Sequence, residues 1–110
     1  MYKSKLLFVC SKNKWRSLTA EKILESNEDY SVKSAGTEAG ARVKITSGLV
    51  RWADIIFVME KKHRTRLQES FSSELIDKQI VVLNIPDDFQ FMDEELISIL
   101  ESRLEAYLEL

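Results

Sequence analysis

Short apolar segments alternate along the chain with longer segments in which apolar and charged positions recur at helical spacing. The apolar segments predict β-strands, and the clearest of them are typical of strands buried on both faces. These predicted strands lie at 5–9, 30–35, 54–59 and 79–83. The remaining periodic segments predict amphipathic helices at 17–28, at 46–52, at 60–71 and from Asp93 to Leu108.

A strand followed by a helix, repeated four times, is the pattern of an α/β fold. Helical crossovers return the chain to the same end of the sheet, so consecutive strands run parallel. We therefore expect a single domain, 1–110, with a four-stranded parallel sheet, helices on both faces and a flavodoxin-like arrangement. Such sheets bind ligands at the carboxyl ends of strands, where the strand order reverses. Cys10 ends the first apolar segment and should lie at that edge.

The composition is typical of a globular protein, with 110 residues, 45% of them hydrophobic and 31% charged. One cysteine can form neither an intrachain disulfide nor a zinc–cysteine site. No apolar run approaches the roughly 20 residues that span a bilayer. The run Leu6–Cys10 is also shorter than a signal-peptide core of about 7–15 residues. These features predict a cytoplasmic protein with no membrane partner.

Charge is distributed unevenly along the chain. Residues 1–70 carry 14 Lys and Arg against 8 Asp and Glu, whereas residues 71–110 carry 2 against 10. The formal net charge of −2 therefore conceals a basic part that attracts anions. The acidic part has two interpretations, a distinct acidic region or simply the solvated face of the last helix.

The segment from Cys10 to Ser17 carries the strongest chemical signal, a cysteine, five residues, an arginine and a hydroxyl residue. A loop of this length can turn its backbone N–H groups inward, and the following helix adds its positive end. Arg16 can bind two phosphate oxygens, and the positive surroundings favour the nucleophilic thiolate of Cys10. Ser17 can donate a hydrogen bond to that thiolate, while Asn13 tolerates the left-handed backbone that closes the loop. The predicted phosphate-binding residues are Ser11, Lys12, Asn13, Lys14, Trp15, Arg16 and Ser17.

The loop resembles that of the low-molecular-weight protein tyrosine phosphatase family, and the similarity touches nearly the whole chain. After the apolar strand and its cysteine come an Asn-x-x-Arg-Ser turn and the pair Ala20 and Glu21. Segments 34–37, 53–60 and 85–89 are similar to the family's second strand, third strand and acid-bearing loop. The resemblance implies the family's fold and the hydrolysis of phosphomonoesters through a phosphocysteine intermediate.

Such hydrolysis needs a general acid that protonates the leaving oxygen and then activates water. The family's acid is the aspartate of an Asp-Pro-Tyr motif, and the resemblance aligns Asp87 with it, with Asp88 in place of the proline and Phe89 in place of the tyrosine. Asp88 is the alternative acid, and Asp93 is a more distant candidate that we expect to cap a helix. A third interpretation is that these carboxylates are only solvated loop residues.

Two departures from the family pattern bear on the substrate. Residues 38–43 contain no aromatic residue, where the family usually supplies a wall for phosphotyrosine, although Trp15 and Phe89 could partly replace it. Cations could also give the mouth a positive rim that attracts acidic phosphopeptides or phosphorylated nucleic-acid ends. The candidate rim residues, which could equally be ordinary surface cations, are Lys12, Lys14, Arg42 and Lys44.

The sequence thus predicts a cysteine-dependent phosphatase acting on protein phosphotyrosine or a related aryl or nucleic-acid phosphate. We expect neither a metal nor another cofactor, because the loop and Arg16 can neutralise the transferring phosphoryl group. The alternatives are a non-catalytic phosphate-binding module and an arsenate reductase that uses an external thiol. His63 has no second histidine with which to bind a metal, so it is expected at the surface or in helix packing. An exposed apolar edge at Leu108 and Leu110 would support a dimer, but the oligomeric state is not predicted.

Overall fold

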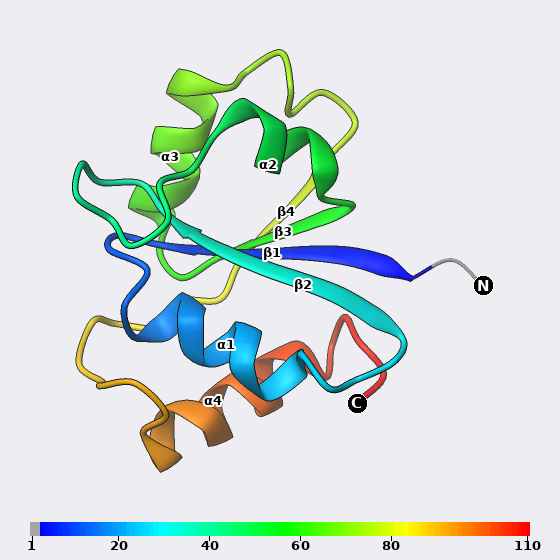
Figure 1. The fold of residues 1–110 in the computed structure, drawn as a ribbon, viewed down its shortest axis with the longest axis vertical. Coiled ribbons are helices and arrows are strands. Elements are labelled where there is room, and N and C mark those ends of the chain that lie inside the picture. Colours follow the sequence, from blue (N-terminus) through cyan, green and yellow to red (C-terminus); the bar gives the residue numbers. More distant parts are fainter. Residues whose placement is uncertain (1–2) are drawn as a thin grey trace.

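The computed structural model describes residues 3–110. Its sheet is wholly parallel and has the strand order β2-β1-β3-β4, as Figure 1 shows. The strands are β1 (Ser4–Cys10), β2 (Tyr30–Gly36), β3 (Ile55–Val58) and β4 (Gln79–Val82). The predicted four-stranded parallel sheet is therefore confirmed.

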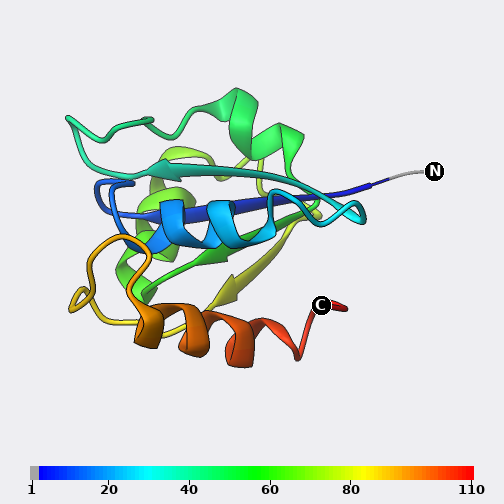
Figure 2. The same cartoon turned by 60° about the horizontal axis from the view of Figure 1, so that its bottom comes forward.

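Helices cover both faces of the sheet, as predicted, and Figure 2 shows the two layers. The helices are α1 (Arg16–Leu24), α2 (Ser47–Trp52), α3 (Lys61–Ser70) and α4 (Glu94–Leu104). Apolar side chains of α1 and α4 pack on one face, whereas those of α2 and α3 pack on the other. This arrangement follows from crossovers of one handedness on either side of the central strand.

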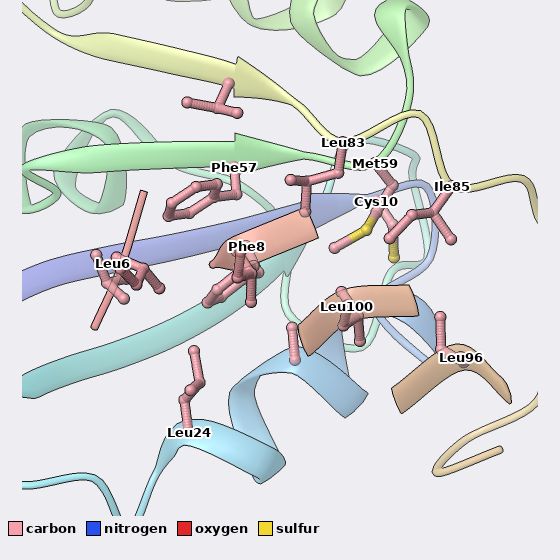
Figure 3. Packing of buried hydrophobic residues seen from close by; sticks show 14 residues of the cluster. Leu6, Phe8, Cys10, Leu24, Phe57, Met59, Leu83, Ile85, Leu96 and Leu100 are labelled. Carbon is pink, nitrogen blue, oxygen red and sulfur yellow. The ribbon is translucent and has the colours of Figure 1, made fainter. Parts of the chain in front are cut away.

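β1 lies in the middle of the sheet and is buried on both faces. Leu6, Phe8 and Cys10 point toward α1 and α4, while Leu7 and Val9 point toward α2 and α3. Figure 3 shows the first of these clusters, in which the Phe8 and Phe57 rings stack with centroids 5.1 Å apart. A strand with apolar side chains on both faces has a fixed register, which also fixes where its carboxyl end lies.

The last helix begins as predicted but ends earlier. Asp93 Oδ1 accepts hydrogen bonds from the backbone N–H groups of Glu95 and Leu96, so the predicted cap is confirmed. The helix ends at Leu104, and the prediction that it continues to Leu108 is wrong. The chain turns after Leu104, which buries Leu108 in the core. Leu108 therefore cannot form the exposed apolar edge considered for a dimer.

The topology places the loops that follow all four parallel strands at one edge of the sheet (Figure 1). β1 is paired with β2 on one side and with β3 on the other, so the strand order reverses beside it. The loop after β1 therefore has as neighbours residues 37–43, which follow β2, and Glu60, which follows β3 closely. Within residues 3–110, no helix has both the length and the apolar character to cross a membrane.

Candidate functional site

The loop between β1 and α1 curls around the sulfur of Cys10. Asn13 has a φ of 59°, the left-handed conformation that its residue type tolerates. Its backbone N–H donates to Cys10 Sγ at 3.3 Å. The start of α1 follows the loop directly, so the positive end of the helix adds to the field around the sulfur. The left-handed conformation expected at Asn13 is thus confirmed.

A buried chain of hydrogen bonds orients the hydroxyl of Ser17 toward the sulfur. Asn13 Nδ2 donates to both Ser17 Oγ and Ser34 Oγ at 2.8 Å, and Ser34 Oγ donates to Glu21 Oε1 at 2.5 Å. Ser17 Oγ lies 2.9 Å from Cys10 Sγ. Because Ser17 already accepts from an amide N–H, its own proton is available for the sulfur. Ser17 can therefore donate a hydrogen bond to the sulfur of Cys10.

Arg16 is almost completely buried, with 1% of its surface exposed. Its Nη1 donates to Glu60 Oε2 at 2.6 Å and to the carbonyl oxygen of Ile85 at 2.9 Å. Its Nε lies 3.6 Å from Asp87 Oδ1. These contacts hold the guanidinium plane in one orientation beside the loop. Binding of a ligand there therefore carries little entropic cost for ordering this side chain.

Glu60 and His63 connect the start of α3 to the loop between β1 and α1. Glu60 is the N-cap residue of α3, and its backbone N–H donates to His63 Nδ1 at 3.0 Å. Nδ1 is thus an acceptor, so the neutral ring carries its proton on Nε2, which donates to Ser11 Oγ at 2.9 Å. Of the two places expected for His63, the surface is wrong, because the residue is only 1% exposed; it is a buried residue of α3 and touches the loop.

The same environment sets the charges of these two residues. Burial would raise the pKa of Glu60, but the hydrogen bond and the charge of Arg16, with smaller contributions from Lys62 and His63, lower it below its usual value. Burial and the nearby charge of Arg16 lower the pKa of His63 to about 4, although Glu60 opposes this shift. At neutral pH, His63 is therefore an uncharged donor beneath the loop.

Because the imidazole of His63 is buried, we expect acidification to lower the free energy of unfolding already at pH values above those at which most carboxylates titrate. The unfolded chain binds a proton at His63 near pH 6.5, whereas the folded chain does so only near pH 4. Stability is therefore fully present above pH 6.5 and is lost as the pH falls below it, by about 2 kcal/mol between pH 7 and pH 5. Urea unfolding at pH 5, 6 and 7 measures this slope. His63→Gln, which removes the only histidine, should flatten it, and equal slopes in the two proteins would contradict the assignment.

Gly36 allows β2 to approach the loop between β1 and α1 closely. A Cβ at this position would lie 2.5 Å from the carbonyl oxygen of Ser11 and 2.7 Å from the Cβ of Ala41. The next residues then bind the loop through their backbone, with Thr37 donating to the Cys10 carbonyl at 3.0 Å and Glu38 donating to the Ser11 carbonyl at 3.0 Å. The loop is thus supported by hydrogen bonds from the segment after β2.

A pocket of about 280 Å³ opens over Cys10. It is lined by Cys10, Ser11, Lys12, Lys14, Trp15, Arg16, Glu38, Lys62 and Asp87. Asp87 lies at its mouth with 52% of the side chain exposed. Neither Asp88 nor Asp93 lines the pocket. The structure therefore brings the first of the three candidate acids to the sulfur-bearing loop and leaves the other two outside.

The aromatic and cationic residues of the mouth differ in part from expectation. Trp15 lines the pocket and is 44% exposed, whereas Phe89 packs against the core and does not line it. Lys12 and Lys14 line it as predicted. Lys62, which was not predicted, also lines the pocket, whereas the other two expected rim cations, Arg42 and Lys44, do not. Those two bind backbone carbonyls instead, Arg42 that of Asn13 and Lys44 that of Thr37.

Sequence reasoning missed the residues that support the loop from other elements. Glu60 had a signal, because it follows a predicted strand and so lies at the ligand-binding edge. Glu21 is four residues after Ser17, which places the two on one face of α1. Ser34 and His63 had no signal of their own, because their contacts depend on how β2 and α3 pack.

The chain matches no protein-family model and no curated protein sequence, but it does match solved structures. The low molecular weight protein tyrosine phosphatase SP-PTP from Streptococcus pyogenes has a TM-score of 0.75 at 19% identity, with 96% of this chain and 94% of that chain covered. The tyrosine phosphatase Wzb from Escherichia coli K30, in complex with phosphate, has a TM-score of 0.77 at 20% identity, with 96% of each chain covered.

A phosphatase named for a different phosphorylated residue has the same architecture. The YwlE arginine phosphatase from Geobacillus stearothermophilus has a TM-score of 0.68 at 19% identity, with 97% of this chain and 99% of that chain covered. These likenesses extend over almost the whole of each chain, and at such identities they establish the architecture. This chain has the fold of the low-molecular-weight protein tyrosine phosphatases.

Proposed function

We propose that this protein is a cysteine-dependent phosphatase that hydrolyses phosphomonoesters through a phosphocysteine intermediate. The observation that carries the proposal is the joint placement of three groups at one pocket: the sulfur of Cys10, the buried guanidinium of Arg16 and the carboxyl group of Asp87. A nucleophile, a binder of phosphoryl oxygens and an acid are the groups that this reaction requires.

In the first step, the Cys10 thiolate attacks phosphorus and the bond from phosphorus to the ester oxygen breaks. The carboxyl group of Asp87 gives its proton to the departing oxygen, which releases the alcohol. In the second step, the Asp87 carboxylate takes a proton from water as the water oxygen attacks the same phosphorus. The sulfur–phosphorus bond breaks, inorganic phosphate leaves, and Ser17 stabilises the returning thiolate with its hydrogen bond.

The phosphate loop and Arg16 stabilise the charge that develops on the equatorial oxygens. Arg16 is already oriented by Glu60 and by the carbonyl oxygen of Ile85, so little reorganisation accompanies the reaction. The curled loop offers backbone N–H groups at the start of α1. The reaction needs a reduced thiol, which fits the cytoplasm proposed from the lone cysteine.

The phosphatases that share the fold support the class of reaction and leave the phosphorylated group open. Two of them are named for tyrosine and one for arginine. In this chain Trp15 offers the aromatic surface of the pocket, and the lysines of its rim suit an anionic substrate. We therefore propose phosphotyrosine or a related aryl or nucleic-acid phosphate as the substrate class.

The placement of Asp87 predicts a selective loss of acid catalysis. Asp87→Asn should lower kcat for a phosphate ester with a poor leaving group, such as phenyl phosphate, by about 10²-fold, because asparagine cannot donate the required proton. Asp88→Asn is the matched control and should retain nearly the wild-type rate. Phosphate release across pH 5–8 measures both variants, and a larger loss in Asp88→Asn would reverse the assignment.

The same assay separates the two alternatives. A wild-type protein that binds inorganic phosphate but releases none from aryl phosphates, phosphopeptides or phosphorylated RNA ends would be a binding module. A protein that reduces arsenate in the presence of an external thiol, with no ester hydrolysis, would be an arsenate reductase. Turnover of an ester that depends on Cys10 supports the phosphatase.

A further inference from the structure

A second cavity of about 330 Å³ adjoins the pocket over Cys10. The two share the lining residues Ser11, Glu38 and Lys62. The remaining residues that line the second cavity are Thr37, His63, Thr65 and Arg66. The lining contains no Leu, Ile, Val, Met, Phe, Tyr or Trp residue, so it suits a polar group rather than an aromatic ring.

The shared wall presents a hydrogen-bond donor to both spaces. His63 Nε2–H donates to Ser11 Oγ, as the contact of Nδ1 with the Glu60 N–H requires. Ser11 Oγ accepts this bond, so its own proton is available to a ligand. Because burial and neighbouring charge lower the pKa of His63 to about 4, this donor order persists throughout the neutral range.

The second cavity also carries a surplus of positive charge. Arg66 makes no ion pair within residues 3–110, and Lys62 Nζ lies 3.7 Å from Glu60 Oε2. Glu38 is the carboxylate in the lining, and its position between the two cavities suits a hydroxyl group rather than an anion. An unpaired guanidinium beside polar donors is a binding group for phosphate or carboxylate.

We propose that the second cavity binds a second anionic group, a phosphate or carboxylate, carried by the alcohol part of the substrate. The inference rests on the proposed function, because it assumes that the scissile phosphate lies over Cys10. Lys62 borders both sites and helps to hold the two anions near each other, while Glu38 accepts hydrogen bonds from hydroxyl groups between them. Within the proposed substrate class, the second cavity then favours phosphate esters whose alcohol part carries a second anion, and a sugar bisphosphate is a simple probe of that second group.

Two matched substrates and two matched variants test this proposal. Glucose 6-phosphate and glucose 1,6-bisphosphate differ by one phosphate group, and phosphate release is measured for both at about 0.15 M salt, where screening limits nonspecific attraction. Arg66→Gln removes the unpaired cation. Arg64→Gln removes a cation from the same helix that lines neither cavity.

Wild type and Arg64→Gln should show a KM for the bisphosphate about tenfold lower than for the monophosphate, as expected for one charge-assisted contact. Arg66→Gln should lose most of this preference, with its rate on phenyl phosphate unchanged. Equal KM values for the two sugars in wild type, or equal effects of the two variants, would overturn the inference.

The rate of phenyl phosphate hydrolysis distinguishes a failure of the second-site proposal from a failure of the proposed phosphatase activity. Hydrolysis of phenyl phosphate without preference for the bisphosphate refutes the second site and leaves the phosphatase intact. If no ester is hydrolysed, the proposed function fails, and calorimetric titration of wild type, Arg66→Gln and Arg64→Gln with both sugars takes over. Tighter binding of the bisphosphate that depends on Arg66 but not on Arg64 supports the second site, and equal binding of the two sugars refutes it.

Discussion

Replacing Cys10 by serine is expected to lower the rate of aryl phosphate hydrolysis by at least about 10⁴-fold, a loss comparable with that of other catalytic nucleophiles. The serine hydroxyl remains protonated at neutral pH, and neither the N–H of Asn13 nor the hydroxyl of Ser17 removes its proton. Phosphate release from phenyl phosphate measures the loss.

Binding provides the control for this variant. The loop N–H groups and Arg16 are unchanged in Cys10→Ser, so calorimetry should still detect inorganic phosphate. Because the chain has one cysteine, the rate of alkylation by iodoacetate reports on Cys10 alone in wild type, and phosphate should slow it. Turnover at the wild-type rate in the serine variant would exclude the phosphocysteine mechanism.

Replacing Arg16 by lysine should lower kcat by about 10³-fold, near the upper range for loss of one preorganised donor to a developing charge. Lysine keeps a positive charge for Glu60 but cannot present a planar fork that holds Glu60, the Ile85 carbonyl and a phosphoryl group together. The KM should change less than kcat, because the charge that attracts the substrate remains. Steady-state kinetics on phenyl phosphate separate the two constants.

Arg51→Lys is the matched control for Arg16→Lys, because Arg51 is exposed on α2 and lines neither pocket. It should retain wild-type kinetics. Thermal unfolding of both variants checks that they fold at the assay temperature. If a folded Arg16→Lys protein retained the wild-type kcat, the guanidinium would not be the group that stabilises the transition state.

Most of the fold could be predicted because its signals are local and strong. The apolar run of β1 is buried on both faces, which requires a layer of helices on each side. The end of α4 could not be predicted in the same way. Leu108 continues the helical spacing, but the chain leaves the helix after Leu104 to bring that side chain into the core. Periodicity does not distinguish these two routes to burial.

The left-handed turn in the loop from Cys10 to Ser17 could also be predicted, because Asn13 is a residue type that tolerates it. The support of this loop could not, because that support comes from elements distant in sequence. His63 binds Ser11 across 52 positions, and the polar, basic segment around it is typical of an exposed helix. For Phe89 the error is reversed. This aromatic residue was expected near the mouth of the pocket, but it packs against the core.

Glu60 makes stability and activity difficult to change separately. One of its carboxylate oxygens binds Arg16, the residue is the N-cap of α3, and its backbone N–H sets the tautomer of His63. A substitution here would remove the shorter of the two carboxylate contacts of the buried guanidinium and weaken the start of a helix at the same time. Adaptation to a new substrate has more freedom at Lys62 and Arg66, whose side chains are exposed to solvent. The residues that hold Arg16 and the loop are thus coupled to one another, whereas the exposed residues at the edge of the pockets can be substituted one at a time.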